Sequence, residues 1–485
     1  MRAEVSVLLA LPLLATATTY NLSALFGSVL SPDAEYYYPS DANWTGEVTQ
    51  RWSTWHAPTY LGAIKPATER DVQDIVKIAS AHNISFLATG GGHGVSQNLA
   101  NVQNAIDIDL SNFKTVEVDE ANNQVIVGGG ATYGQLYDPL YKIGKEIPTG
   151  NAECVGVVGA SVGAGVGLLQ GLHGYTSDAL LSARIVTASG VLFEASATNN
   201  TDLFWAIRGA GANFGIITSA TYRIYDATNG GQAQNADFLF PQTANRSVWD
   251  ALQTLDETLP AELSVTITSA YNQTSAQAAI LVNLVYFGPQ DEFQPYVNQF
   301  VALNPTRWRN ITAPWNNLIA QANFGAPSSS CDTNEHINMF SIALNKTDPL
   351  TFQGFFDDMI LFSQMNPSYS GAWVIERYGS QGPMAVPTES RGVYPWREAK
   401  MQLLFESNYA NSSLDDTVDA FYTQQRQHFN EFSGFNTFAT YVNYAHGDEG
   451  PNAWYGDADN LSRLSALKSK WDSNNLFGAA KPVPF

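Results

Sequence analysis

The stretch Ala88-Thr89-Gly90-Gly91-Gly92-His93-Gly94 decides how the rest of the chain is interpreted. It follows an apolar, strand-like run from Ile84 to Leu87 and places four glycines around one histidine. Because glycine has no Cβ, successive backbone N–H groups can turn inward and approach a bound anion closely. The stretch therefore predicts a loop that holds a phosphate or pyrophosphate, with the histidine beside whatever that group carries. A glycine-rich turn with an incidental histidine is the alternative.

Size and charge limit the classes of protein to which the chain can belong. Its 485 residues exceed one ordinary core and suggest two connected domains. The net charge of -21 argues against nucleic acid or an anionic membrane as a partner. Residues 1–19 combine Arg2, an apolar run and small residues near Ala17, the pattern of a secretory signal peptide. No later run is long and apolar enough to span a membrane, so we expect a soluble, secreted, extracellular protein.

The sequons and cysteines are relevant to the expected secretion of the protein. Ten Asn-x-Ser/Thr sequons agree with export, at Asn21, Asn43, Asn83, Asn199, Asn245, Asn272, Asn310, Asn345, Asn411 and Asn460. The two cysteines, Cys154 and Cys331, do not make a disulfide scaffold. A single bridge between them stays open, although the glycine-rich surroundings of Cys154 do not favour one. The seven histidines are scattered and no carboxylates have ligand spacing, so no metal site is expected.

Hydrophobic periodicity divides the chain into parts that differ in their expected pattern of helices and strands. Up to about residue 228, helices and strands interleave around glycine-rich loops. In this part, Thr68 and Asp71 predict a capping box at the start of a helix. Alternation along 106–110 predicts that Asp107 and Asp109 lie at the surface. Four helices and five strands are expected after that, in an antiparallel sheet covered by helices. The helices are 246–258, 290–303, 350–364 and 414–432; the strands are 263–269, 279–286, 337–344, 372–378 and 401–406. Residues 440–444 are strand-like, and a final helix follows.

Four motifs in this order carry a resemblance to a known family. They are Gly91-Gly92-His93-Gly94, the glycine-rich segment from Val155 to Gly167, the run from Asp202 to Gly215, and Tyr441-Val442-Asn443-Tyr444. Together they resemble the berberine-bridge-enzyme-like branch of the vanillyl-alcohol-oxidase family of FAD-linked oxidases, over residues 45 to 480. A Rossmann site is not expected, since no G-x-G-x-x-G opens a helix with an acidic residue some 20 positions on.

The resemblance implies an α+β fold with a PCMH-type, two-subdomain FAD-binding domain and a substrate domain. Residues 20–228 would form the N-terminal part of the FAD-binding domain, 229–435 the substrate domain with its antiparallel sheet, and 436–485 the segment that completes the FAD-binding domain. The substrate-domain sheet would cover the isoalloxazine ring. A cofactor would supply the redox chemistry that side chains cannot.

The resemblance also implies which residues bind FAD. In relatives, the histidine at the position of His93 is bonded covalently to the flavin. Many relatives add a cysteine link, but aligning the glycines places Ala152 at that cysteine position and Cys154 two residues later. We therefore expect attachment through His93 alone; a two-residue slip that restores a Cys154 link is the alternative. The cofactor-binding residues implied are Thr89, Gly90, Gly91, Gly92, His93, Gly94, Val155, Gly156, Gly159, Ala160, Gly163, Gly165, Gly167, Gly215, Ile216 and Asn443.

Three residues are candidates for catalysis. Tyr444 matches a tyrosine that several relatives use as base, and a phenol with a pKa near 10 needs cationic or hydrogen-bonding help to act near neutrality. Gln402 and Glu406 share a face of a predicted strand where relatives place a base or substrate-binding residue. The alternatives are a packed tyrosine and solvent-facing sheet residues. His173 is interpreted as structural and His446 as a neighbour of the site.

The function implied is a FAD-dependent oxidase that acts on an organic hydroxyl or activated C–H bond and reduces O2 to hydrogen peroxide. The small residue Val155 favours oxidase over dehydrogenase, because relatives with valine there react with oxygen. The substrate would be a small molecule, either a secondary metabolite or, alternatively, a carbohydrate oxidised at its reducing end. A non-redox cyclase or a flavin-binding protein is an alternative of another class. The sequence leaves the oligomeric state open.

Overall fold

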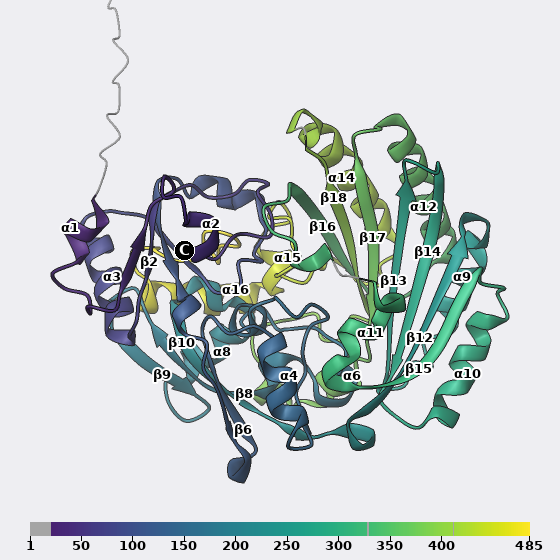
Figure 1. The fold of residues 1–485 in the computed structure, drawn as a ribbon, viewed down its shortest axis with the longest axis horizontal. Coiled ribbons are helices and arrows are strands. Elements are labelled where there is room, and N and C mark those ends of the chain that lie inside the picture. The colour runs from purple at the N-terminus through teal and green to yellow at the C-terminus, as the bar shows by residue number, and fades with distance from the viewer. Residues whose placement is uncertain (1–20, 327–328, 411) are drawn as a thin grey trace, which may run out of the picture.

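The computed structural model describes residues 21–326, 329–410 and 412–485, so the predicted signal at residues 1–19 lies outside the described part. Two lobes stand side by side in Figure 1. The purple and blue N-terminal part forms one lobe, the teal and green middle part forms the other, and the yellow C-terminal segment returns to the first. The chain therefore closes the first lobe with residues from both of its ends.

The glycine loop begins at the end of a small sheet in the first lobe. Its spatial order is β1 (Glu35–Tyr37), β2 (Tyr60–Lys65), β4 (Ala105–Asp109) and β3 (Phe86–Thr89). Strand β4 runs parallel to both β2 and β3, and α3 (Glu69–Ala81) makes the crossover between β2 and β3. The capping box predicted for Thr68 and Asp71 is confirmed at the start of this helix. The loop at Gly90 thus starts at the end of β3, which is a typical ligand position in parallel sheets.

The surface position expected for Asp107 and Asp109 is wrong, because both side chains are buried. Asp109 accepts hydrogen bonds from Thr49 N at 2.8 Å and Thr49 Oγ1 at 3.0 Å. Asp107 accepts one from Thr89 Oγ1 at 2.6 Å, and burial, with the charge of Asp109, raises its pKa to about 7. Alternation did place the two carboxyls away from the apolar side, but other elements cover that side too.

An antiparallel sheet and short helices complete the first lobe. The five strands, in spatial order, are β5 (Val116–Asp119), β6 (Gln124–Gly128), β10 (Ile216–Arg223), β8 (Leu180–Val186) and β9 (Leu192–Ser196), and β7 (Lys145–Glu146) pairs with β11 (Tyr225–Asp226). The helices of this lobe before residue 228 are α1 (Leu22–Phe26), α2 (Trp44–Glu47), α4 (Gly134–Tyr141), α5 (Val157–Ser161), α6 (Gln170–His173), α7 (Thr176–Ala179) and α8 (Thr201–Ala210).

A seven-stranded antiparallel sheet forms the second lobe. Its spatial order is β15 (Arg307–Pro314), β12 (Gln232–Pro241), β14 (Gln277–Tyr286), β13 (Leu263–Asn272), β17 (Ser370–Arg377), β18 (Met401–Asn408) and β16 (Ile337–Leu344). The five predicted strands are confirmed, and β12 and β15 are additions. Both were missed because polar residues interrupt the alternation: β12 carries Asn235 and Asp237 in its centre, and β15 is an edge strand that buries only Ala313.

The four predicted helices are confirmed as α9 (Asn245–Thr254), α10 (Gln290–Val301), α12 (Pro349–Met365) and α14 (Asp415–Glu431). They cover the outer face of the sheet (Figure 1), where a core of aliphatic and aromatic side chains fills the interface. Of the shorter helices, α11 (Leu318–Gly325) packs against β12, β14 and β15, and α13 (Gln381–Ala385) packs against α6 of the first lobe. The opposite face of the sheet is left to line the space between the lobes.

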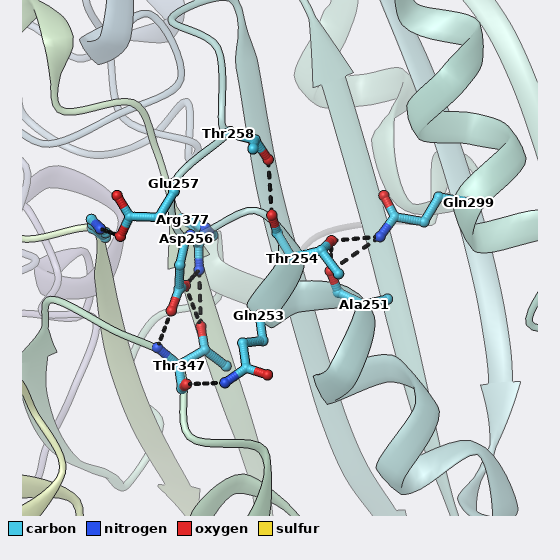
Figure 2. Close-up of polar contacts among 10 residues, drawn as sticks. Ala251, Gln253, Thr254, Asp256, Glu257, Thr258, Gln299, Thr347 and Arg377 are labelled. Atoms are coloured by element: carbon cyan, nitrogen blue, oxygen red, sulfur yellow. Dashed lines mark hydrogen bonds and ion pairs between the residues drawn. The ribbon is translucent and has the colours of Figure 1, made fainter.

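A buried ion pair fixes the end of β17 to the helix layer (Figure 2). The fully buried Arg377 donates from Nη1 to Asp256 Oδ1 at 2.7 Å and to Thr347 Oγ1 at 3.0 Å. Asp256 also accepts a hydrogen bond from Thr347 N at 2.8 Å. Because side chains alternate along a strand, the preceding residue, Glu376, points to the other face, toward the first lobe. This anchoring holds the backbone from which Glu376 projects.

The C-terminal segment packs into the first lobe rather than onto the sheet. Residues 440–444 form turns, so the strand expected there is wrong; their bonds go to helix α5 and its neighbours instead of to a strand. Helices α15 (Pro451–Tyr455) and α16 (Ala458–Trp471) follow. Lys468 of α16 donates to Asn213 O at 2.9 Å, which joins the tail to the region after α8. The tail thus brings Tyr444 between the two lobes.

Candidate active site

A cavity of about 710 Å³ lies between the lobes. Three parts of the chain line it: the glycine segments of the first lobe, the inner face of the seven-stranded sheet, and the C-terminal segment around Tyr444 and Lys481. Fourteen of the predicted cofactor-binding residues are in the lining: Thr89, Gly90, Gly91, Gly92, His93, Gly94, Val155, Gly156, Gly159, Ala160, Gly163, Gly215, Ile216 and Asn443. The catalytic candidates Tyr444 and Glu406 line it as well. The fold therefore brings together segments that lie more than 300 positions apart.

The first glycine loop needs its glycines because backbones meet there. A Cβ at Gly91 would lie 2.5 Å from Gly156 N, and one at Gly90 would lie 2.9 Å from Gly129 O. Gly92 has a φ of +74°, which favours glycine. Thr89 fixes the base of the loop through its bond to Asp107. The two glycine segments predicted from sequence are thus packed directly against each other along one side of the cavity.

The second glycine segment serves two purposes. A Cβ at Gly159 would meet nothing within 4 Å, so this residue leaves open space in the cavity. By contrast, Gly165 and Gly167 lie outside the cavity lining; a Cβ at Gly165 would meet Thr176 at 2.6 Å, and one at Gly167 would meet Thr149 O at 1.8 Å. These two positions serve packing in the structure, and the sequence pattern does not separate them from the lining glycines.

Asn443 ties the tail to this segment. Its Nδ2 donates to Ala160 O at 2.9 Å and to Tyr441 Oη at 2.8 Å. Tyr441 Oη in turn accepts from Gly165 N at 3.0 Å. A Cβ at Gly163 would overlap Asn443 Oδ1, at 2.1 Å. The glycine at 163 therefore makes room for the asparagine that positions Tyr444 one residue later.

His93 projects from the glycine loop against an aromatic side chain. Its ring stacks on Trp52 with centroids 5.8 Å apart and planes 17° from parallel. Burial, followed by the nearby charge of Arg51, lowers the pKa of His93 to about 4. The imidazole is therefore neutral at physiological pH, so one ring nitrogen has a lone pair available for bonding to carbon.

The two cysteines form a disulfide between the lobes. Cys154 and Cys331 are joined, with their Cα atoms 5.7 Å apart and 177 positions between them in the sequence. The bridge that the sequence left open is therefore formed, despite the glycine-rich surroundings of Cys154. It ties the loop that carries Val155 to the second lobe. With its sulfur in this bond, Cys154 has no thiolate to offer to a cofactor, in agreement with the expectation of no second link.

A hydrogen-bonded group of polar side chains lines the cavity where the sheet, the C-terminal segment and the loop before Cys154 meet. Tyr444 Oη donates to Glu376 Oε2 at 3.0 Å, and Asn151 Nδ2 donates to Glu376 Oε1 at 2.6 Å. Burial raises the pKa of Glu376 to about 7, although both hydrogen bonds favour its charged form. Burial, and then the charge of Glu376, raises the pKa of Tyr444 well above its ordinary value. Of the two kinds of help that a phenol could receive, cationic or hydrogen-bonding, the structure provides a hydrogen-bonding partner, the carboxyl of Glu376.

The other two catalytic candidates lie on β18, on the face that the sequence predicted. Glu406 lines the cavity, and burial, with the charge of Glu376, raises its pKa to about 7. Gln402 is buried opposite Glu376 in the sheet register but lies outside the cavity lining. The structure therefore places Glu406 where it can meet a ligand and gives Gln402 a position beside the central group.

Several site residues were missed by sequence reasoning, namely Arg51, Trp52, Asn151, Glu376, Lys481 and, behind the lining, Asp237. Glu376 had a detectable signal: it is a charged residue on the same face of a predicted strand as Ala372 and Val374. His446 is buried against Phe340 and lies outside the cavity lining. The structural interpretation of His173 agrees with its contacts, since it bonds Glu146 at 2.7 Å and stacks on Tyr225.

The residues present fit a dinucleotide such as FAD. Two cations, Arg51 and Lys481, line the cavity near the first glycine loop, where phosphate charges would lie. Lys481 is buried, donates to Val95 O, and has its pKa lowered to about 8 by burial. Valines and glycines of the second segment offer an apolar wall for a flat ring. Within the described ranges, no group of three or more His, Cys, Asp or Glu side chains could hold a metal ion, and no helix could cross a membrane.

Comparisons with known proteins agree with this geometry. A family described as "FAD binding domain" matches residues 60–196, and one described as "Berberine and berberine like" matches residues 440–484. The FAD-linked oxidoreductase azaL of Aspergillus niger is 48% identical over 464 residues, covering 95% of this chain and 98% of that protein. The FAD-linked oxidoreductase tazL of Aspergillus terreus is 44% identical over 492 residues, covering 100% of each.

Solved structures show the same fold at low sequence identity. BBE-like 1 of Physcomitrella patens aligns with a TM-score of 0.82 at 23% identity, covering 96% of this chain and 99% of that chain. The glucooligosaccharide oxidase of Acremonium strictum aligns with a TM-score of 0.81 at 21% identity, with the same coverage. From these matches and from the cavity that joins its two glycine segments to its tail, the chain belongs to the berberine-bridge-enzyme-like FAD-linked oxidoreductases.

Proposed function

We propose that this protein is an oxidase that removes two hydrogens from a hydroxyl-bearing or otherwise activated carbon of a small organic molecule and forms hydrogen peroxide from O2. The observation that carries the proposal is the hydrogen bond between Tyr444 and Glu376 inside the cavity that fits FAD. FAD, when bound, accepts a hydride from the substrate carbon and passes two electrons to oxygen. The protein has to receive the proton that the substrate hydroxyl loses.

Tyr444 and Glu376 are suited to receive that proton together. With its pKa well above 10, Tyr444 is not a phenolate at neutral pH and cannot act as an isolated base. Glu376, with a pKa of about 7, is largely ionised just above neutrality. As the substrate hydroxyl gives its proton to Tyr444 Oη, the tyrosine can pass its own proton to Glu376. Asn151 holds the carboxylate in place from its other oxygen.

We propose that FAD is attached through His93 alone. The neutral imidazole and its position in the glycine loop support a histidine link. Glucooligosaccharide oxidase of Acremonium strictum carries a 6-S-cysteinyl, 8α-N1-histidyl FAD. Here the disulfide with Cys331 engages Cys154, which supports a single link. The small side chain of Val155 in the cavity lining supports access of oxygen.

The lining supports a largely apolar substrate. On the inner face of the sheet and the segment beside it, hydrocarbon side chains predominate, among them Leu281, Leu318, Ile319, Val374 and Leu404. Glu376 and Glu406 add acidic groups on the sheet, which disfavour an anionic substrate. A metabolite with an apolar ring and a hydroxyl fits this lining better than a sugar, whose many hydroxyls would each need a partner.

We also propose that the protein is secreted. The pattern of residues 1–19 and the disulfide support an oxidising compartment. The sequons at Asn21, Asn43, Asn83, Asn199 and Asn272 are exposed and accessible to glycosylation. Asn245 is buried, and its Nδ2 donates to Asp357 Oδ1 at 3.0 Å, so we expect that sequon to stay unmodified in the folded protein.

Anaerobic mixing tests the proposed activity. The purified holoenzyme is mixed without oxygen with cinnamyl alcohol or cellobiose, and the flavin absorption is followed; air is then admitted and peroxide measured. We expect bleaching with cinnamyl alcohol and about one peroxide per flavin re-oxidised, as the two-electron balance requires. Bleaching by cellobiose alone would favour the carbohydrate alternative. If neither compound, nor a wider panel of both classes, reduced the flavin, a cyclase or binding protein would be the better interpretation.

A further inference from the structure

The wall of the cavity beside the sheet has an unusual backbone. Helix α11 ends in Asn323, Phe324 and Gly325, which have φ angles of 55°, 61° and 70°. Three successive residues in the left-handed region are rare, and a phenylalanine there is disfavoured because its Cβ crowds the carbonyl oxygen. Ala322 and Asn323 line the cavity, as do Leu318 and Ile319 from the preceding turn. A strained segment therefore forms part of the substrate cavity.

A buried carboxylate holds this segment in place. Asp237, in the middle of β12, is fully buried and accepts hydrogen bonds from Asn323 N and Phe324 N, each at 2.8 Å. Successive backbone N–H groups that converge in this way form an anion-binding nest. Arg309 Nε donates to the same carboxylate at 2.7 Å. The charge of Asp237 thus offsets the unfavourable backbone conformation of the wall.

The same carboxylate also reaches the inner face of the sheet. Asn283 of β14 lines the cavity and donates from Nδ2 to Asp237 Oδ1 at 2.7 Å. From the neighbouring strand β15, the guanidinium of Arg307 lies over the ring of Phe324, 4.2 Å from its centroid, and that of Arg309 lies 5.5 Å from it. Asp237 therefore sets the position of the wall relative to the sheet that carries Glu376.

We propose that Asp237 is a positioning residue that determines substrate specificity by holding the wall formed by Leu318, Ile319 and Ala322 against the cavity. The proposal rests on the proposed function, since it assigns this wall the apolar ring of the oxidised alcohol. The three side chains offer hydrocarbon to a ring, and a wall held at a fixed distance selects flat apolar molecules over hydrated ones. Loss of the carboxylate releases the wall and weakens binding of the ring, while the proton-accepting group stays intact.

Hydrogen exchange tests the positioning role without any substrate. Holoenzymes of the wild type and of Asp237→Asn are compared by exchange and mass spectrometry on peptides that cover residues 318–326. We expect exchange at Asn323 and Phe324 to be about tenfold faster or more in the variant, because a buried N–H loses its acceptor. A second substitution, Phe324→Gly, should restore part of the protection, since glycine adopts the left-handed region freely. Unchanged exchange in Asp237→Asn would overturn the proposal.

Asp256→Asn is the matched control. Asp256 also accepts from a backbone N–H, a hydroxyl and an arginine, but on the helix-covered face of the same sheet (Figure 2). Its loss should leave exchange at residues 318–326 unchanged. If Asp256→Asn accelerated exchange there as much as Asp237→Asn, the effect would be a general loss of stability and the proposal would be wrong.

Binding of cinnamyl alcohol tests the specificity role. The probe is titrated into each holoenzyme and the change in flavin absorption gives Kd, with kcat and KM measured where turnover occurs. We expect Kd and KM to rise about tenfold in Asp237→Asn, with kcat within about twofold of the wild type. This is the pattern that results when a lost contact stabilised the bound substrate and the transition state equally. Unchanged Kd, or no binding to the wild type, would overturn the wall assignment. Binding without turnover would count against the proposed function alone.

Discussion

Replacing Glu376 by glutamine removes the group to which Tyr444 donates while keeping nearly the same volume. In the wild type, Tyr444 Oη lies 3.0 Å from the carboxylate, and Asn151 donates to its other oxygen at 2.6 Å. A glutamine can still accept one of these hydrogen bonds, so the fold and the cavity should persist. It cannot take up a proton at neutral pH, so the route from substrate to Tyr444 to residue 376 is closed.

The size of the effect follows from the role of the carboxylate. Loss of a positioned general base slows a reaction by about 10²–10⁴-fold, so we expect kcat of Glu376→Gln to fall in that range at pH 8. In the wild type the pKa of Glu376 is about 7. The rate should therefore rise with pH, about tenfold per unit well below pH 7, and level off above it. The variant should be slow and should lack this dependence.

The assay is the rate of flavin reduction at saturating substrate under anaerobic conditions, measured from pH 5 to 9. Glu406→Gln is the control, because Glu406 is a second cavity carboxyl whose pKa is also about 7. It should keep the pH dependence that Glu376→Gln loses. If Glu376→Gln retained the wild-type rate and profile, or if only Glu406→Gln lost them, Glu376 would not be the proton acceptor.

Three further outcomes are expected. Tyr444→Phe should slow flavin reduction about as much as Glu376→Gln, and combining the two should add little, since both groups serve one proton transfer; full additivity in the double variant would contradict the relay. Cys154→Ser should lower the unfolding free energy by roughly 2–5 kcal/mol, because the disulfide to Cys331 closes a long loop, and should leave flavin attached; loss of attachment would revive a role for Cys154. Burial raises the pKa of Glu376 to about 7, so the folded protein loses stability as pH rises toward that value. In urea unfolding, Glu376→Gln should therefore have a higher free energy of unfolding than the wild type at pH 8, by up to about 3 kcal/mol. At pH 5 the two proteins should not differ in this way.

Local patterns in the sequence predicted the elements that carry a regular signal. The five strands and four helices of the second lobe were found because apolar residues recur with period 2 or 3.6 along them. Strands β12 and β15 were missed because polar residues interrupt their apolar pattern. Such residues bond side chains or backbone groups of other elements, as Asp237 does with the backbone N–H groups of Asn323 and Phe324. Residues 440–444 alternate like a strand, yet their bonds go to a helix rather than to another strand.

The residues of the site also fall into those that the sequence could predict and those that it could not. His93 and the glycines could be predicted because a close backbone approach permits few residue types. Asn151 could not be predicted, and Glu376 could be noticed only as a charged residue on an apolar strand face, because their roles arise only when β17 and the loop before Cys154 meet across two lobes. The pKa of Tyr444 is likewise raised by burial between the lobes and by the charge of a carboxylate 68 positions earlier, so the sequence could not name the group that assists the phenol. Long-range contacts of this kind leave no mark on a local pattern.

Peptide mapping of the acid-precipitated wild-type protein tests whether FAD is bonded to His93 and to no other residue. After precipitation and digestion without reducing agent, the absorption and mass of each peptide show where the flavin is attached. We expect flavin on the peptide that contains His93, and a flavin-free disulfide-linked pair that contains Cys154 and Cys331. Flavin on the Cys154 peptide would contradict the single link and the disulfide together, and a colourless precipitate with no flavin in the supernatant would contradict the assignment as a FAD-dependent oxidase.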